Sequence, residues 1–150
     1  MQQVPDLASE QELIILNIKQ HFPAWAAAVQ SAQQVQIRKL SGMSNACYKV
    51  ELAKDIPLTD KAVPRTLLYR KFECKIVDRQ VEATIFQRMS DAGLGPQMYF
   101  QNEHYRIEGF FEGRPLTIWE LRNPFFTQKF VETLFQLHEK SGNAAAINAI

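Results

Sequence analysis

The chain has 150 residues, 46% of them hydrophobic, and a formal net charge of +1 at pH 7. This length suffices for one domain with a buried core, and the balanced charge gives no electrostatic reason to expect a nucleic-acid partner or an anionic membrane surface. No apolar run reaches the roughly 20 residues that a membrane span needs. The first ten residues are polar and do not resemble a signal peptide. The two cysteines show no CxxC or metal-ligand spacing, so we expect a cytoplasmic protein with reduced thiols.

Helices are predicted at the start of the chain. Ser9 followed by Glu12 forms a capping-box pattern ahead of an apolar stretch. Pro23 ends that helix and suits the first turn of a second helix at 24–32. Residues 1–35 could therefore cover a sheet or serve as a homodimer interface, and the pattern leaves both open.

Strands follow, joined by turns and one further helix. Apolar and polar residues alternate on both sides of a Gly-containing turn, and Gly93, Gly95 and Pro96 end a stretch of helical periodicity. Strands joined by hairpin-length turns favour an antiparallel sheet, since parallel neighbours need long crossovers. The fold class is therefore α+β, with about five antiparallel strands and packed helices. The predicted strands are 35–40, 48–52, 66–72, 97–100 and 105–111, and the later helices are 76–92, 117–122 and 125–139.

A turn of small residues between the first two strands could bind phosphate. Small side chains let backbone N–H groups approach a phosphate chain, and Ser44 and Asn45 add side-chain donors. A single glycine between strands also occurs in an ordinary hairpin, and the turn is not a Walker A loop. The residues are Ser41, Gly42, Met43, Ser44 and Asn45.

A cation lies within the third predicted strand. Leu68, Arg70 and Phe72 share one strand face, so the Arg70 guanidinium would be partly desolvated and would need an anionic partner. The alternatives are a solvated arginine on an edge strand, or Lys71 as the functional cation if the register shifts by one.

The following helix offers a carboxylate. Glu82 shares a helix face with Ile85 and Phe86, and a carboxylate on an apolar face needs a partner. Protein kinases pair a strand cation with a helical Glu to hold nucleotide phosphates, so we expect an Arg70–Glu82 pair. The alternative is that Glu82 lies on a solvated flank.

The last predicted strand runs into a connector that could hold an adenine. Such a ring lies against hinge backbone in a two-lobed kinase, between apolar side chains. The four features occur in kinase order: Gly-containing turn, cationic strand, Glu helix and hinge. The hinge residues are Glu108, Gly109, Phe110 and Phe111.

Several stretches resemble the choline/ethanolamine kinase family, whose members have a protein-kinase-like fold. Residues 40–45 (LSGMSN) resemble the family's (S/T)GG(M/L)(S/T)N loop, and LLYR at 67–70 is similar to its Arg-bearing strand. VDR at 77–79, Glu82 and GPQMY at 95–99 resemble its VDR…E…(G/A)P(K/Q)LY segment. RIEGFF at 106–111 is similar to its RLExFI hinge, so the resemblance covers residues 36–139.

The resemblance implies a function. Such enzymes transfer the γ-phosphoryl group of ATP to choline or ethanolamine with Mg²⁺, the first step of phosphatidylcholine and phosphatidylethanolamine synthesis. Arg70 would contact the phosphates, Glu82 would order Arg70, loop 41–45 would cover the phosphates, and adenine would lie against 108–111. The implied parts are N-terminal helices at 1–35, a nucleotide-binding lobe at 36–111, and a connector with the first helices toward a C-terminal lobe at 112–150.

Two departures from the family pattern bear on activity. Ser41 stands where the family has the first glycine of a pair, and the chain has no HxD of the family's HxDxxxxN motif. We therefore expect a fragment without the catalytic base, the Mg²⁺ ligands or the acceptor pocket, inactive by itself. The alternatives are an aminoglycoside-phosphotransferase-like small-alcohol kinase, or a non-catalytic regulatory or binding module that pairs with a longer kinase.

Overall fold

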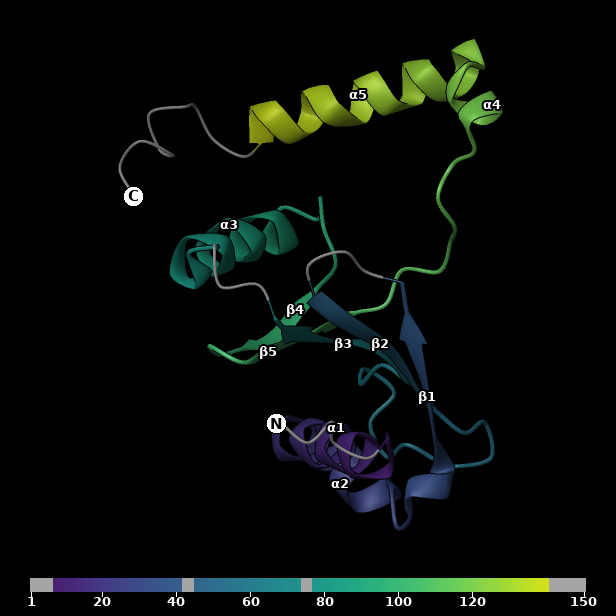
Figure 1. Ribbon diagram of the computed structural model, residues 1–150, viewed down its shortest axis with the longest axis vertical. Coiled ribbons are helices and arrows are strands. Elements are labelled where there is room, and N and C mark those ends of the chain that lie inside the picture. The colour runs from purple at the N-terminus through teal and green to yellow at the C-terminus, as the bar shows by residue number, and fades with distance from the viewer. Residues whose placement is uncertain (1–6, 42–44, 74–76, 141–150) are drawn as a thin grey trace, which may run out of the picture. The chain divides into compact units, whose positions relative to one another are not determined.

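The computed structural model describes residues 7–41, 45–73 and 77–140 (Figure 1). Helices and strands follow one another much as the periodicities predict. The elements are α1 (Leu7–His21), α2 (Pro23–Ala28), the 3₁₀ helix η1 (Ala32–Gln34), β1 (Val35–Leu40), β2 (Asn45–Leu52), β3 (Thr66–Phe72), α3 (Arg79–Asp91), β4 (Met98–Gln101), β5 (Tyr105–Gly109), α4 (Ile118–Leu121) and α5 (Pro124–Lys140).

The five strands form one antiparallel sheet in the order β1-β2-β3-β5-β4. This confirms the α+β class and the antiparallel five-stranded sheet. Two hairpins, β1–β2 and β4–β5, are joined through β3, so β3 and β5 are central neighbours. The residues that these two strands carry therefore meet although about 40 positions separate them, as between Leu67 and Gly109 or Leu68 and Glu108.

The chain divides into two compact units. The first comprises Met1–Val77 with Met98–Phe110, and the second comprises Asp78–Gln97 with Phe111–Ile150. The sheet, α1 and α2 belong to the first unit, whereas α3, α4 and α5 belong to the second. The three-part division expected from the sequence stays a prediction.

The N-terminal helix begins earlier than its capping-box pattern indicates. Helix α1 begins at Leu7, so Ser9 lies within it rather than capping it. The prediction that Ser9 and Glu12 form the cap is wrong, because burial outweighs a local capping preference here. Ile14 and Ile18 are 2% and 0% exposed, and such burial stabilises a helix more than one cap does.

Helix α2 is shorter than predicted. It ends at Ala28 because Val29 takes an extended conformation and buries its side chain, which is 2% exposed. The Val29 carbonyl accepts a hydrogen bond from Lys19 Nζ at 2.9 Å. A β-branched residue favours the extended backbone that lets the chain turn here. The rest of the predicted 24–32 helix is replaced by this turn and the start of η1.

The core lies between the sheet and the helices α1 and α2, which cover one of its faces (Figure 1). Trp25 is fully buried, and its indole N–H donates to the Pro64 carbonyl at 3.0 Å. The helices thus cover the sheet, one of the two expected roles; the homodimer stays a prediction. The core residues from α1, α2 and the junction between them are Ile14, Ile15, Ile18, Phe22 and Trp25, and those from the central strands include Tyr48, Val50, Leu67, Tyr69, Tyr105 and Ile107.

The helices of the second unit have local capping interactions at their ends. Asp78 caps α3, accepting from the backbone N–H groups of Gln80 and Val81 at 2.9 and 3.2 Å. Gly93 follows α3 with φ +68°, a conformation that glycine adopts without strain. Thr117 and Glu120 form a capping box at α4. No helix in the described part of the chain is both long and apolar enough to span a membrane.

Candidate functional site

Arg70 and Glu108 form an ion pair across two neighbouring strands. Nη2 of Arg70 in β3 lies 2.6 Å from Oε1 of Glu108 in β5. The alternation of β3 buries Leu67 and Tyr69 in the core and directs Arg70 to the opposite face. The side chain of Arg70 is 26% exposed and that of Glu108 only 1%. Arg70 is therefore partly desolvated and has an anionic partner, as its position in the strand predicts.

Arg106 binds the other oxygen of the same carboxylate. Its Nε lies 2.5 Å from Oε2 of Glu108, and its side chain is 3% exposed. Arg106 also donates to Oε1 of Gln101 in β4 at 3.1 Å, and its guanidinium carbon lies 5.8 Å from the ring centre of Phe72. A buried carboxylate thus lies between two guanidinium groups, an arrangement that we call the Arg70–Glu108–Arg106 triad.

Sequence reasoning missed this triad. It assigned Glu108 to the adenine side and gave Arg106 no role, although the two stand two positions apart on one strand face. An arginine and a glutamate at that spacing were the available signal. What could not be read was the pairing of β5 with β3, which places Arg70 opposite Arg106.

Lys71, the alternative cation, lies on the other face of the sheet. Its Nζ is 2.7 Å from Oε1 of Glu10 in α1. The hydrogen bond from Lys71 is the main reason that the pKa of Glu10 lies below its usual value of 4.5. Lys71 therefore fastens α1 to the sheet, and Arg70 is the cation that shares a face with Glu108.

Glu82 lies in α3, within the second unit. Its Oε2 is 2.5 Å from Nη1 of Arg79, one turn earlier on the same helix. The two side chains are 27% and 16% exposed, so Glu82 has a partner rather than lying on a freely solvated flank. The expected Arg70–Glu82 pair joins residues of different units, and it stays a prediction.

The candidate phosphate loop joins β1 to β2. Ser41 follows β1 and Asn45 begins β2, whereas Gly42, Met43 and Ser44 fall outside the described residues. The strand register aligns Leu40 with Cys47 and Cys47 with Arg70. The loop therefore emerges at the end of the sheet where Arg70 is located. Asn45 Oδ1 accepts from the backbone N–H of Glu73 at 3.4 Å.

The hinge residues leave the sheet where β5 ends. Gly109 pairs with Leu67 of β3, and Phe110 is the last residue of the first unit. The Nζ of Lys49 lies 4.7 Å from the ring centre of Phe110, a cation–π distance. Phe111, the first residue of the later segment of the second unit, is 67% exposed. The strand is two residues shorter than its predicted bounds, because the chain leaves the sheet after Gly109.

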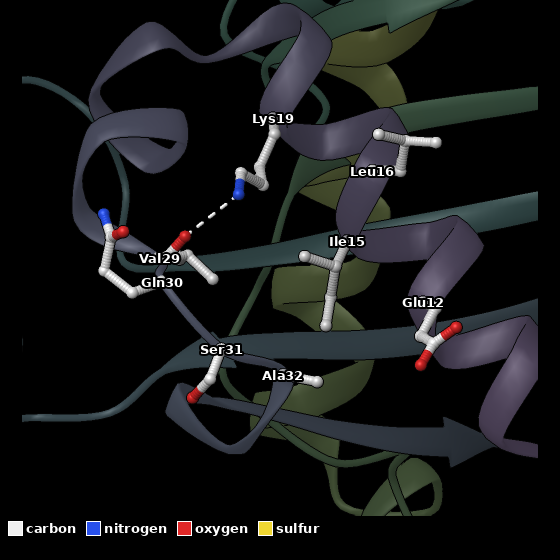
Figure 2. Close-up of a pocket in the computed structure, with 8 residues that line it drawn as sticks. All are labelled: Glu12, Ile15, Leu16, Lys19, Val29, Gln30, Ser31 and Ala32. Carbon is white, nitrogen blue, oxygen red and sulfur yellow. Dashed lines mark hydrogen bonds between the residues drawn. The ribbon is translucent and has the colours of Figure 1, made fainter.

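Among the hollows in the described part of the first unit, two border α1 or lie on β1 and β2. One, of about 260 Å³, lies between α1 and the segment that leads from α2 to η1, bordered by Ile15, Leu16 and Val29 (Figure 2). The other, of about 210 Å³, is lined by Gln36, Arg38, Lys49 and Glu51 in β1 and β2. In the stretches that the structure describes, no group of three or more His, Cys, Asp or Glu side chains could hold a metal ion.

The comparison with protein families is decisive, because a model of choline/ethanolamine kinases matches residues 36–143. The chain belongs to the choline/ethanolamine kinase family. Arg70, Glu82, Arg106 and Glu108 all lie inside the matched stretch. The predicted membership of this family is thereby confirmed.

Individual relatives agree with this assignment. The human choline/ethanolamine kinase is 30% identical over 100 residues, which are 65% of this chain and 25% of that protein. The choline kinase of Saccharomyces cerevisiae is 33% identical over 111 residues, 71% of this chain and 18% of that protein. This choline/ethanolamine kinase family member therefore spans about a quarter or less of the length of these curated relatives.

Solved structures support the fold. A choline kinase from Cryptosporidium parvum matches with a TM-score of 0.71 at 23% identity, covering 89% of this family member and 36% of that chain. An ethanolamine kinase from Plasmodium vivax matches with a TM-score of 0.61 at 18% identity, covering 95% and 42% respectively. At such identities the matches show the shared fold, in which a five-stranded antiparallel sheet is packed with helices.

Proposed function

We propose that the chain provides the ATP-binding part of an enzyme that phosphorylates choline or ethanolamine. The observation that carries the proposal is the position of Arg70: partly exposed, fixed by a buried carboxylate, and at the sheet end from which loop 41–45 emerges. Membership of the choline/ethanolamine kinase family supports the reaction class.

The residues present fit the phosphate chain of ATP. A guanidinium presents several N–H donors in one plane, which suits bidentate binding of phosphate oxygens. The loop around Gly42 contributes small residues, whose backbone N–H groups can approach an anion closely. Arg70 would then bind the phosphates beneath a loop that spans Ser41 to Asn45.

The other predicted site residues fit the same proposal. Adenine would lie against residues 108–111, and Glu82 would help to order Arg70. When bound, MgATP supplies the phosphoryl group that is transferred. The base that activates the acceptor hydroxyl would come from an HxD motif, which these 150 residues lack, so we expect no turnover by them alone. A homodimer and a cytoplasmic location stay predictions.

Nucleotide binding to the 150-residue chain tests the proposal. We expect calorimetry or NMR titration to show that MgATP binds more weakly than the low-micromolar range. A nucleotide that normally lies between two lobes would find the contacts of only one lobe in these 150 residues. No saturable ATP binding at millimolar concentration would overturn the proposal. A coupled ADP assay with choline and ethanolamine should show no turnover, and clear turnover would contradict the expected need for additional residues.

A further inference from the structure

We propose that Glu108 is a positioning residue that orients Arg70 toward the phosphates of ATP, with Arg106 as the anchor of the Glu108 carboxylate. This inference rests on the proposed function and assigns Glu108 a role beyond the adenine side. Three neighbouring strands supply the parts: Arg70 from β3, Arg106 and Glu108 from β5, and Gln101 from β4.

The division of the two carboxylate oxygens restrains Glu108. Oε1 binds Arg70 at 2.6 Å and Oε2 binds Arg106 at 2.5 Å. Rotation about the last side-chain bond would move both oxygens away from their donors at once. With only 1% of the side chain exposed, water cannot replace a lost partner, and an unpaired buried carboxylate is costly. The carboxylate therefore has a defined orientation.

Arg106 is suited to anchoring and not to binding a ligand. It is 3% exposed, so a nucleotide cannot reach its guanidinium in this arrangement. Glu108, Gln101 and the ring of Phe72 contact it from different strands. These contacts fix its guanidinium, and through the bond from Nε it fixes the Glu108 carboxylate in turn.

Arg70 is the exposed end of the triad. It engages Glu108 through Nη2 while 26% of its side chain remains exposed. A guanidinium is a rigid plane with five N–H donors, so the bond to a fixed carboxylate restrains the directions in which its other donors point. Orientation matters for a phosphate ligand because bidentate geometry, more than charge alone, distinguishes arginine from lysine at such sites. A long side chain held in advance also loses less entropy on binding.

A purely structural role accounts less well for this arrangement. Buried ion pairs add little net stability compared with apolar residues of similar size. Core residues of the same strands, such as Ile107, are apolar. Retaining three ionisable groups on the face that bears Arg70 is consistent with a requirement for a fixed guanidinium.

Comparison of two ligands separates positioning from general structure. ATP carries phosphates and adenosine does not, so a defect in Arg70 orientation should appear only with ATP. In Glu108→Gln, which keeps size and removes charge, we expect ATP affinity to fall by about tenfold, the loss of one charge-assisted contact. Adenosine affinity should stay within about twofold, by NMR titration of both ligands. The matched control is Glu103→Gln, an exposed glutamate in the β4–β5 turn, which should leave both affinities unchanged.

A second substitution tests whether Glu108 acts through Arg70. In an Arg70→Gln background, Glu108→Gln should cause no further loss of ATP affinity, since the positioned group is already gone. Should Glu108→Gln fail to fold by circular dichroism, Glu108→Asp keeps the charge but shortens the reach, and the same loss specific to ATP is expected.

The outcomes are distinguishable. Three outcomes would overturn the positioning role of Glu108: an equal loss of affinity for ATP and adenosine, no loss for either, or an undiminished effect of Glu108→Gln in the Arg70→Gln background. None of these outcomes would overturn the proposed ATP-binding function of the chain. Failure of the unmodified chain to bind ATP would overturn the proposed function, and this inference with it.

Discussion

The ammonium nitrogen of Lys71 lies 2.7 Å from a carboxylate oxygen of Glu10 in α1, while its neighbour Arg70 binds Glu108 on the opposite face of the sheet. Two adjacent cations of β3 therefore have separate tasks. One attaches a helix to the core face, and the other belongs to the face that carries the candidate nucleotide site. The alternation of a strand makes this division unavoidable.

Substitution of the two cations should separate binding from stability. Arg70→Gln should weaken ATP binding by about tenfold or more, because it removes a charged donor from the phosphates. Lys71→Gln should leave ATP affinity unchanged and lower the free energy of unfolding by at most about 1 kcal/mol, since the pair is partly solvated. Calorimetry and urea denaturation measure the two quantities. Equal ATP affinities of the two variants would refute the assignment of Arg70.

Among the core residues, Trp25 should cause the largest loss of stability when its side chain is truncated to alanine. Its fully buried side chain predicts a loss of about 3–5 kcal/mol on Trp25→Ala, from lost burial and the remaining cavity. Trp119→Ala is the matched control, because Trp119 is 76% exposed and should change stability by less than about 0.5 kcal/mol. Urea denaturation followed by far-UV circular dichroism provides the comparison, and similar midpoints for the two variants would contradict the core position.

Stability should fall on mild acidification because of His21. Its ring stacks on Phe100 with centroids 3.6 Å apart, and Nε2 lies 3.1 Å from the Tyr105 hydroxyl. Burial holds the pKa of His21 below its ordinary 6.5, because the charged imidazolium is poorly solvated there. The unfolded chain thus binds a proton more readily than the native state does. The contribution of neutral His21 to the free energy of unfolding is therefore fully present above pH 6.5 and decreases as the pH falls below that value.

Two glutamine variants test this pH dependence. His21→Gln should show a smaller loss of stability than the unmodified chain between pH 7.5 and 5.5. His104→Gln, at an exposed position, should retain the original dependence. Urea denaturation at several pH values measures both, and an unchanged pH dependence in His21→Gln would show that another group is responsible.

Glu120 should titrate far below the ordinary pKa of a glutamate side chain. Two hydrogen bonds from the Arg114 guanidinium, at 2.6 and 2.8 Å, and the backbone N–H of Thr117 lower its pKa to about 2. Its stabilising effect is therefore present above its ordinary value of 4.5 and is lost only as the pH falls toward 2. In Arg114→Gln the pKa should move back toward 4.5. NMR titration of the side-chain carboxyl carbon measures it, and an unchanged low pKa would exclude Arg114 as the main cause.

Much of the fold was predictable because it depends on local patterns. The bounds of β1 and β3 agree with their predicted ranges, since alternation of apolar residues depends on one strand alone. Helix ends were predicted less well. Ser9 looked like a cap, and α2 looked three to four residues longer, because the burial of Ile14, Ile18 and Val29 is a property of the assembled core and not of their neighbours in sequence.

By itself the sequence determined the family, the antiparallel α+β class, and the residues of β3 that share a face with Arg70. Only the tertiary structure decided which carboxylate Arg70 binds within the sheet. Glu108 lies 38 positions along the chain and meets Arg70 because β5 enters the sheet beside β3. Strand order arises from long-range pairing and shared burial, which local periodicity does not encode, so the Arg70–Glu108–Arg106 triad could be recognised only once the sheet was assembled.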